Sequence, residues 1–314
     1  MMDYSKEFEM IVKAYEKSGG NVSNLLRKDI ASVIINGDKV IGLNGVQGVE
    51  LKPQRIENGV FVNIRIKGVI KNPIHICTGF VGKRGYQKVI FNITVEKNSS
   101  VGFISHCSFP WSEDFTHDAE MYVHIEPGGK MEYRDEHFHS ESGKINFISK
   151  VKAVVEKGGY FADFFRLTRT RVGRMDLFME ISLGEEAVGH LDATVKASKD
   201  DNVSIKEILN LDGKGSRGIA KTTAVALDKA RVTVINEAYG NAEGTKGHVV
   251  CEEITKGDGV IVNASPILEV RNERSELTHE ASIGRVNQKQ LETLMAKGLS
   301  EEEATNLIIK GIVG

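Results

Sequence analysis

The chain contains 314 residues, enough to bury a large core as one or two domains. Its 41 basic and 43 acidic side chains give a net charge of −2 without a basic cluster, which argues against nucleic acid as a partner. The three cysteines form no Cys-x-x-Cys pair, and no apolar run approaches bilayer length. We therefore expect a cytoplasmic protein with reduced thiols rather than a secreted or membrane protein.

The amino-terminal residues have a helical pattern. Apolar side chains recur at i, i+3, i+4 and i+7 from Phe8 to Tyr15, which predicts an amphipathic helix that the Gly19-Gly20 pair should end. We interpret residues 1–30 as a helical segment that docks on the end of the next domain. Asn36-Gly37, between two β-branched runs, then predicts a tight hairpin.

Turn clusters recur at nearly regular intervals along most of the chain. Neighbouring clusters are about 28 to 30 residues apart, except for two intervals of about half that length. Between the turns apolar residues alternate with polar ones, which is the period of a half-buried strand. Each interval is therefore one strand-turn-strand unit or a multiple of it. The clusters lie near Ser100, Gly129, Gly159, Ala187, Asn202, Ala230, Gly259 and Arg274.

Strands without intervening helices favour a wound fold. No interval contains a convincing helix of a dozen residues, so crossover helices between parallel strands are not expected. A parallel β-helix, or solenoid, stacks coils of this size and buries the apolar face of each coil on the next. We assign this all-β core to residues 31–283, with short helical segments at both termini; an antiparallel sandwich or barrel is the alternative.

Residues 284–314 return to a helical pattern. An apolar stripe ends at Gly298, where a glycine that terminates a helix is expected, and Ser300 with Glu303 forms a capping box that begins a second helix. The segment is either an end cap for the solenoid or a docking surface for another protein. The candidate contact residues on it are Leu291, Leu294, Ser300, Glu303 and Leu307.

Cys251 and Glu280 are about 29 residues apart, which is close to one repeat. If they lie on neighbouring coils, their backbones are about 5 Å apart and both side chains can reach one metal site. A thiolate is the preferred ligand of iron-sulfide clusters, and a carboxylate or imidazole bonds more weakly, which suits a cluster that is passed on. His279 should point to the opposite face from Glu280, and His248 is a weaker candidate. The plain alternative is a buried cysteine and solvated polar residues.

A second column follows from the same spacing. Cys77, Cys107 and His137 follow one another at equal intervals of about 30 residues. These three residues are a sulfur-acceptor path, a second metal site or an unrelated set, and a one-residue bulge in any coil would destroy their register.

A resemblance to a known family lies in the carboxyl-terminal part of the chain, from Cys251 onward. Cys251, the run Pro266-Ile267-Leu268-Glu269-Val270, the run Leu277-Thr278-His279-Glu280-Ala281 and the run from Gly298 to Ala304 occur in order and at matching spacing. Together they resemble the carboxyl-terminal signature of the SufB/SufD family, whose members are scaffold proteins for iron-sulfur cluster assembly in the SUF system.

The resemblance implies a right-handed parallel β-helix, pairing of two subunits through their β-helices, and a SufC-like ABC-type ATPase bound at the carboxyl-terminal helices. It assigns Cys251, Glu280 and His279 to a transient iron-sulfur cluster of the 4Fe-4S type, which makes the chain SufB-like. The stretch from Lys256 to Pro266 lacks the histidine that completes the site in the sister subunit of the paired bacterial complex. We therefore expect a homodimer of a minimal family member.

The expected function is a cluster scaffold that delivers to apo iron-sulfur acceptor proteins. No phosphate-binding loop motif occurs in the sequence, so ATP hydrolysis is assigned to the partner subunit and the chain itself is not expected to be an enzyme. Two alternatives stay open. One is a SufD-like structural subunit without a cluster, and the other is a carbohydrate-active β-helix enzyme, although only 7% of the residues are aromatic.

Overall fold

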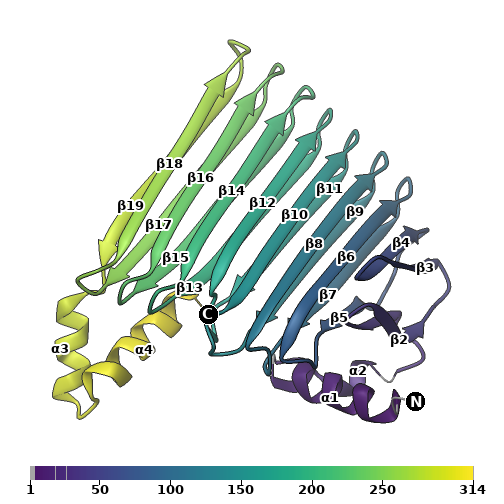
Figure 1. The fold of residues 1–314 in the computed structure, drawn as a ribbon. Coiled ribbons are helices and arrows are strands. Elements are labelled where there is room, and N and C mark those ends of the chain that lie inside the picture. The colour runs from purple at the N-terminus through teal and green to yellow at the C-terminus, as the bar shows by residue number, and fades with distance from the viewer. Residues whose placement is uncertain (1–3, 18, 26, 314) are drawn as a thin grey trace.

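The computed structural model describes residues 4–17, 19–25 and 27–313, so the outermost residues of both predicted terminal segments, 1–3 and 314, lie outside the described part. The described chain is a parallel β-solenoid of about eight turns with short helices at both ends, which confirms the predicted fold class. Figure 1 shows the coils stacked in chain order, with α1 and α2 beside the first coils and α3 and α4 beside the last. The alternative sandwich or barrel is wrong because strands of successive coils pair in parallel.

Two sheets form opposite walls of the solenoid, and from β5 onward successive strands alternate between the two walls. The first sheet has ten strands. In spatial order they are β19 (Glu276–Arg285), β17 (Lys246–Lys256), β15 (Arg217–Leu227), β13 (Val188–Ala197), β11 (Tyr160–Leu167), β9 (Lys130–Phe138), β7 (Ser100–Ser108), β5 (Ile74–Gly79), β1 (Ser32–Asn36) and β2 (Lys39–Asn44).

The second sheet has nine strands, and from β18 to β4 its spatial order follows every other strand of the chain, after which β3 pairs with β4. They are β18 (Ile261–Val270), β16 (Arg231–Gly240), β14 (Asn202–Leu211), β12 (Arg174–Leu183), β10 (Ile145–Val155), β8 (Asp114–Ile125), β6 (Arg84–Val95), β4 (Gly59–Ile66) and β3 (Val49–Ile56).

The coil length varies by single residues along the solenoid. The coil that pairs Asn146 with Arg174 is one residue shorter than the coil that pairs Asn202 with Arg231. The coil that pairs Phe115 with Ile145 is one residue longer still. The turn spacing in the sequence therefore reports the coils correctly, and the two short intervals are half coils. Which side chains stack on one another is decided by these one-residue differences.

Alternation within each strand builds the core. In β12, every second residue from Met175 to Leu183 is at most 2% exposed, while the residues between them are partly exposed. Side chains from both walls thus meet inside the coil, and each buried aliphatic side chain contributes roughly 1.5–3 kcal/mol of transfer free energy. The inward positions of other strands also include the polar groups described below.

The amino-terminal elements cover the first coils. Helix α1 (Tyr4–Lys17) lies on the outer side of β5 and β7, where Ile11 and Tyr15 pack with Ile34 and Cys77; α2 (Val22–Leu25) follows it. The chain then forms the antiparallel hairpin β1–β2 around Asn36-Gly37, as predicted, and a second antiparallel pair, β3–β4.

The carboxyl-terminal helices leave the last coil uncovered. The capping box is confirmed, since Ser300 N and Oγ each lie 2.8 Å from Glu303 Oε2, and Gly298 adopts a φ of 98° between α3 (Gln288–Ala296) and α4 (Glu301–Val313). Figure 1 places both helices at one margin of the last coils rather than over their open end. Most side chains of β18 and β19 are accordingly exposed, whereas alternate residues of β16 and β17 are buried.

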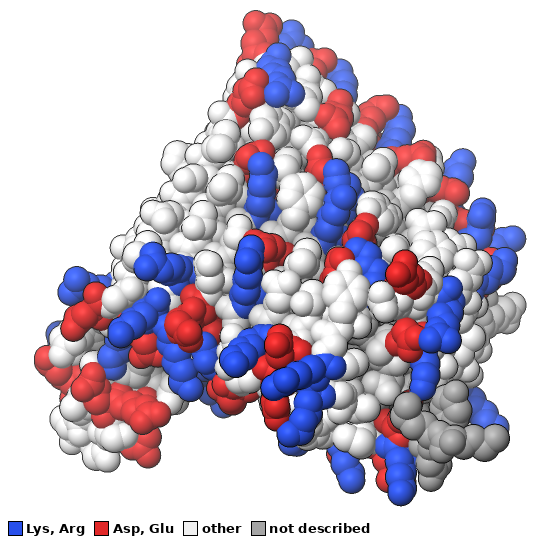
Figure 2. Space-filling model, viewed as in Figure 1, with Lys and Arg blue, Asp and Glu red and all other residues white. Residues whose placement is uncertain are grey.

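Charged side chains are interspersed on the face drawn in Figure 2. Several form ion pairs between neighbouring coils, such as Lys206–Glu237 at 2.7 Å and Lys152–Glu180 at 2.7 Å. Each surface pair of this kind contributes at most about 1 kcal/mol. Because the pairs join residues on neighbouring coils, they favour this register of the coils over a shifted one, although they add little to the overall free energy of unfolding.

Candidate functional site

Cys251 points into the solenoid one coil from its open end. It lies on β17 between Val249 and Glu253, which share its inward row, and only 1% of it is exposed. In register it has Thr222 of β15 on one side and Ala281 of β19 on the other. Burial, with smaller contributions from neighbouring carboxylates, raises the pKa of the Cys251 thiol to about 12, so the thiol is protonated at neutral pH.

Glu280 does not stack on Cys251. Paired residues on β17 and β19 are one residue further apart in the sequence than Cys251 and Glu280 are. Glu280 therefore pairs with Val250, and His279 pairs with Val249. Glu280 therefore points to the outer face, and the expectation that this spacing brings both side chains together within one chain is wrong. His279 and Glu280 point to opposite faces, as expected, and His279 shares the inward side with Cys251. Both residues are exposed: Glu280 lies on the outer face, and the inward His279 is uncovered because no further coil of the described chain follows β19.

His248 belongs to the outer face. Its Nδ1 lies 2.7 Å from Thr278 Oγ1 on the next coil, and it lines a surface groove with His190. This weaker candidate therefore faces away from the Cys251 row.

Two buried carboxylates that the sequence analysis missed lie near Cys251. Glu253 follows it on the same inward row, is 1% exposed, and has no hydrogen-bond partner for either carboxylate oxygen among the described residues. Burial raises the pKa of Glu253 to about 7. Glu207 on β14 accepts hydrogen bonds from Thr222 Oγ1 at 3.0 Å and Asn236 Nδ2 at 2.9 Å, and burial raises its pKa to about 8.

The raised pKa of Glu253 predicts a pH-dependent stability. In the unfolded chain the carboxyl titrates near 4.5 and in the fold near 7. The native state therefore binds the proton more tightly, and the free energy of unfolding falls as pH rises through this window, by roughly 2 to 3 kcal/mol for this group. We expect Glu253→Gln to remove this part of the loss when urea unfolding is compared at pH 4.5 and pH 8.

Glu252→Gln is the matched control, since Glu252 is adjacent in sequence but lies on the outer face of β17. It should retain most of the pH dependence of the original chain, because burial raises the pKa of Glu253 more than the charge of Glu252 does. If Glu253→Gln loses stability with pH as steeply as the original chain does, the carboxyl group is not buried in the manner described.

The predicted stack of Cys77, Cys107 and His137 is interrupted because one of its coils is shorter than the other. Cys77 pairs with His106, whereas Cys107 pairs with His137, so the coil from β5 to β7 is one residue shorter than the coil from β7 to β9. Cys77 consequently points outward beneath α1 against Ile11 and Tyr15, and burial raises its pKa to about 12. The predicted stacking of Cys77 with Cys107 is wrong, because the two side chains lie on opposite faces of the sheet.

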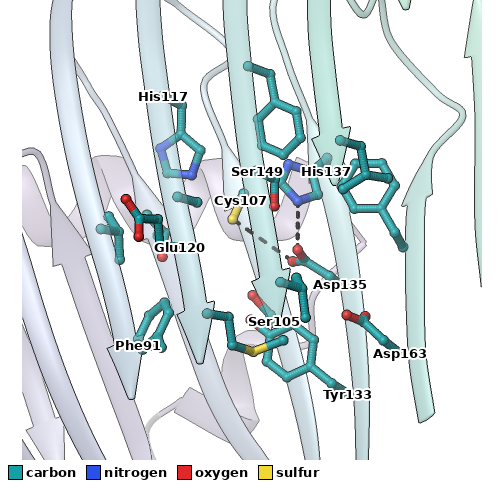
Figure 3. Close-up of a pocket in the computed structure, with 18 of the residues that line it drawn as sticks. Phe91, Ser105, Cys107, His117, Glu120, Tyr133, Asp135, His137, Ser149 and Asp163 are labelled. Carbon is teal, nitrogen blue, oxygen red and sulfur yellow. Dashed lines mark hydrogen bonds and ion pairs between the residues drawn. The ribbon is translucent and has the colours of Figure 1, made fainter. Parts of the chain in front are cut away.

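Cys107 and His137 do stack, and Asp135 joins them inside the coil (Figure 3). One ligand atom from each of the three residues lies within 4.8 Å of the other two. Asp135 was not singled out in the sequence analysis, although it lies two residues before His137 and so shares its face. The interior thus contains two separate groups of reactive side chains, one near Cys107 and one near Cys251.

Comparison with known protein families identifies the family of this chain. Residues 82–312 match the family model described as SUF system FeS cluster assembly, SufBD core domain. The chain belongs to the SufBD family. This confirms the resemblance read from the carboxyl-terminal signature and extends it over most of the chain.

Two relatives named as SufBD family proteins align over the full chain, and a SufB protein aligns over part of it. An iron-sulfur cluster assembly SufBD family protein of Pyrococcus horikoshii is 46% identical over 315 residues, which cover 100% of this chain and 95% of that protein. A SufBD family protein of Methanocaldococcus jannaschii is 32% identical over 100% of this chain and 99% of its own length. The iron-sulfur cluster assembly protein SufB of Bacillus subtilis is 24% identical over 70% of this chain and 48% of its own length.

This SufBD protein is therefore an iron-sulfur cluster assembly protein with a solenoid fold. Among its described helices, none combines the length and the apolar character needed to cross a membrane.

Proposed function

We propose that the chain is a SufB-like scaffold subunit on which an iron-sulfur cluster is assembled and from which it passes to apo iron-sulfur proteins. It acts as a homodimer with a SufC-like ABC-type ATPase, which supplies the ATP hydrolysis. The observation that supports the proposal is the position of Cys251. It lies on β17, next to the uncovered coil, and the last residue of the same strand connects to the terminal helices.

That tether is Lys256, the last residue of β17. Its Nζ lies 2.8 Å from Glu301 Oε1 and 2.5 Å from Thr305 Oγ1, so α4 is bound to the strand that carries Cys251. A force applied to α3 and α4 therefore acts on β17. Because the Cys251 thiol is buried and protonated in the present fold, cluster binding requires the strand to move and the thiol to lose its proton. ATP-driven motion of the partner is the source of that movement in this proposal.

The uncovered coil is the proposed contact between two copies of the chain. Its large apolar side chains Ile261, Ile267, Val270 and Ile283 are 41 to 54% exposed. Strands β18 and β19 are also edge strands whose outer backbone groups have no neighbouring strand among the described residues, and such edges favour pairing with another chain. A second copy seated here brings its own His279 and Glu280 toward Cys251 of the first.

Sharing ligands across the dimer fits the register of the last coil. Within one chain Glu280 faces away from Cys251, so one subunit offers an incomplete ligand set. Two copies provide two thiolates together with imidazole and carboxylate ligands, a mixed set that holds a 4Fe-4S cluster less firmly than four thiolates. Such a set suits assembly followed by release.

Anaerobic reconstitution with iron and sulfide tests the proposed function. We expect a brown protein with cluster absorption that transfers its cluster to an apo-acceptor. A colourless dimer that still captures the ATPase would identify a SufD-like structural subunit instead, and turnover of oligosaccharides would identify a carbohydrate-active enzyme.

The groove between α3 and α4 is the proposed ATPase contact. Leu294, Leu307 and Ile308 line it, and Leu307 is 50% exposed. Ser300 and Glu303 lie exposed at the start of α4, whereas Leu291 is 5% exposed and holds α3 against the last coil rather than facing a partner.

We expect Leu307→Asp to weaken capture of the ATPase by more than about tenfold while leaving the reconstituted iron content unchanged, because a carboxylate in an apolar contact loses burial energy. Co-purification of a tagged ATPase measures the effect. Ile219→Asp is the control, since Ile219 is 41% exposed on the outer face of β15, away from these helices. Equal losses in both variants would rule out the groove as the contact.

A further inference from the structure

Three chemically different ligand groups converge inside the coils formed by β7 and β9. Cys107 Sγ lies 3.9 Å from Asp135 Oδ1, and His137 Nε2 lies 2.8 Å from Asp135 Oδ2. Figure 3 shows the thiol, the carboxylate and the imidazole turned toward one another within the pocket. The parallel register holds them, because Cys107 pairs with His137 and Asp135 pairs with Ser105.

Several polar atoms around this group have unmet bonding capacity. His137 Nδ1, Ser105 Oγ and Thr78 Oγ1 are buried without a hydrogen-bond partner among the residues that the structure describes. A buried polar atom without a partner costs about 1–3 kcal/mol. An ion that enters this cavity together with a coordinated water molecule would give these atoms a partner, because such a water can donate to or accept from them.

The surrounding cavity has the size of a single ion. Its volume is about 30 Å³, above the roughly 10–15 Å³ that one water molecule requires and too small for a multi-iron cluster. Aromatic side chains such as Phe147 and Phe165 form part of its wall. The Asp135 side chain is 15% exposed while that of His137 is 1% exposed, so the carboxylate is the more accessible of the two groups.

We propose that Cys107, Asp135 and His137 bind a single divalent transition-metal ion, and that in this protein the ion is ferrous iron. Thiolate and imidazole ligands favour transition metals over magnesium and calcium, and two anionic ligands neutralise a charge of +2. The bound metal displaces the Cys107 thiol proton, which is released to solvent. The choice of iron rests on the proposed function, whereas the binding of a metal ion does not.

This ion site is separate from the Cys251 site. Cys107 is on β7 and Cys251 is on β17. These strands lie in the same sheet and are separated by five strand-to-strand steps. At about 4.8 Å per strand this places the two cysteines on the order of 24 Å apart. One bound ion cannot contact both, so the two sites can be tested independently.

The test uses the full-length protein carrying Cys251→Ala, without sulfide and without the ATPase. Anaerobic titration with Co²⁺ should give one bound ion per chain and a thiolate-to-cobalt charge-transfer band, and Fe²⁺ should compete for the same site. Adding Cys107→Ser should abolish the band. Asp135→Asn should weaken binding by roughly 10- to 100-fold, the usual cost of altering a metal-binding residue or its hydrogen-bond partner.

Cys77→Ser in the same background is the matched control, because Cys77 is equally buried but faces α1. It should leave both the band and the affinity unchanged. The proposal is overturned if no charge-transfer band appears, or if the band persists in Cys107→Ser. Circular dichroism of each variant shows whether the solenoid is intact, and metal-dependent thermal stabilisation of the Cys77→Ser protein but not of Cys107→Ser gives a second reading of binding.

Discussion

Cys251→Ala is expected to reduce the acid-labile sulfide, and the iron bound with it as a cluster, by at least roughly tenfold after anaerobic reconstitution. Cys251 is the one cysteine next to the uncovered coil, and its removal leaves only oxygen and nitrogen ligands at that end of the solenoid. The substitution removes a small side chain from the interior, so we expect the fold to persist. Metal and acid-labile sulfide analysis of the desalted protein measures the effect.

Cys77→Ala is the control for this variant, since Cys77 is also buried but lies under α1 at the opposite end of the solenoid. Its cluster content should equal that of the original protein. Equal cluster content in Cys251→Ala would remove Cys251 from the ligand set and with it the proposed assembly site. Glu280→Ala and His279→Ala then show which of the two shares the cluster with the thiolate.

Combining Ile267→Lys with Ile283→Lys is expected to convert the proposed dimer to a monomer, raising the dissociation constant by more than about tenfold. These side chains are 43% and 54% exposed in the isolated chain, so lysine costs little in the fold. In a paired end, however, each lysine must lose its hydration when the second copy covers it, which is unfavourable. Sedimentation velocity over a range of concentrations measures the change.

Val154→Lys provides the comparison for the dimer variant. Val154 is 53% exposed on β10, in the middle of the solenoid and away from the open coil. It should leave the dimer intact. A dimer that survives both lysines at the open coil would place the contact on another face, and the shared ligand set would then need a different geometry.

The architecture could be predicted because it depends on local signals. Turn clusters at nearly constant intervals and strict alternation in strands such as β12 are properties of the sequence itself. Capping by Ser300 and Glu303 is equally local. Coils of this period bury their apolar rows only when they are stacked, so the solenoid follows from the pattern.

The site geometry could not be predicted with the same precision, because a strand reverses its side chains at every residue. One residue more or less in a coil moves a side chain to the opposite face. The coil after Cys77 is one residue too short to stack it on Cys107, whereas the coil after Cys251 is one residue too long to stack it on Glu280. The average spacing along the chain contains no information about these individual differences.

Asp135 and Glu253 escaped detection for a different reason. Charged residues in strands are usually exposed, so a carboxylate in an alternating pattern is normally assigned to the outer face. Their positions two residues from His137 and Cys251 were the available signal, since residues i and i+2 of a strand share a face. Only the structure shows that these rows turn inward at both places.

The proposed scaffold function is tested most directly by anaerobic isolation of the protein co-expressed with the proposed ABC-type ATPase partner. We predict that iron, sulfide, two copies of this chain and the ATPase elute together, and that the eluted cluster activates an apo iron-sulfur acceptor. A stable complex with the ATPase that contains neither iron nor sulfide, and that transfers no cluster after reconstitution, would contradict the claim that this chain is the scaffold.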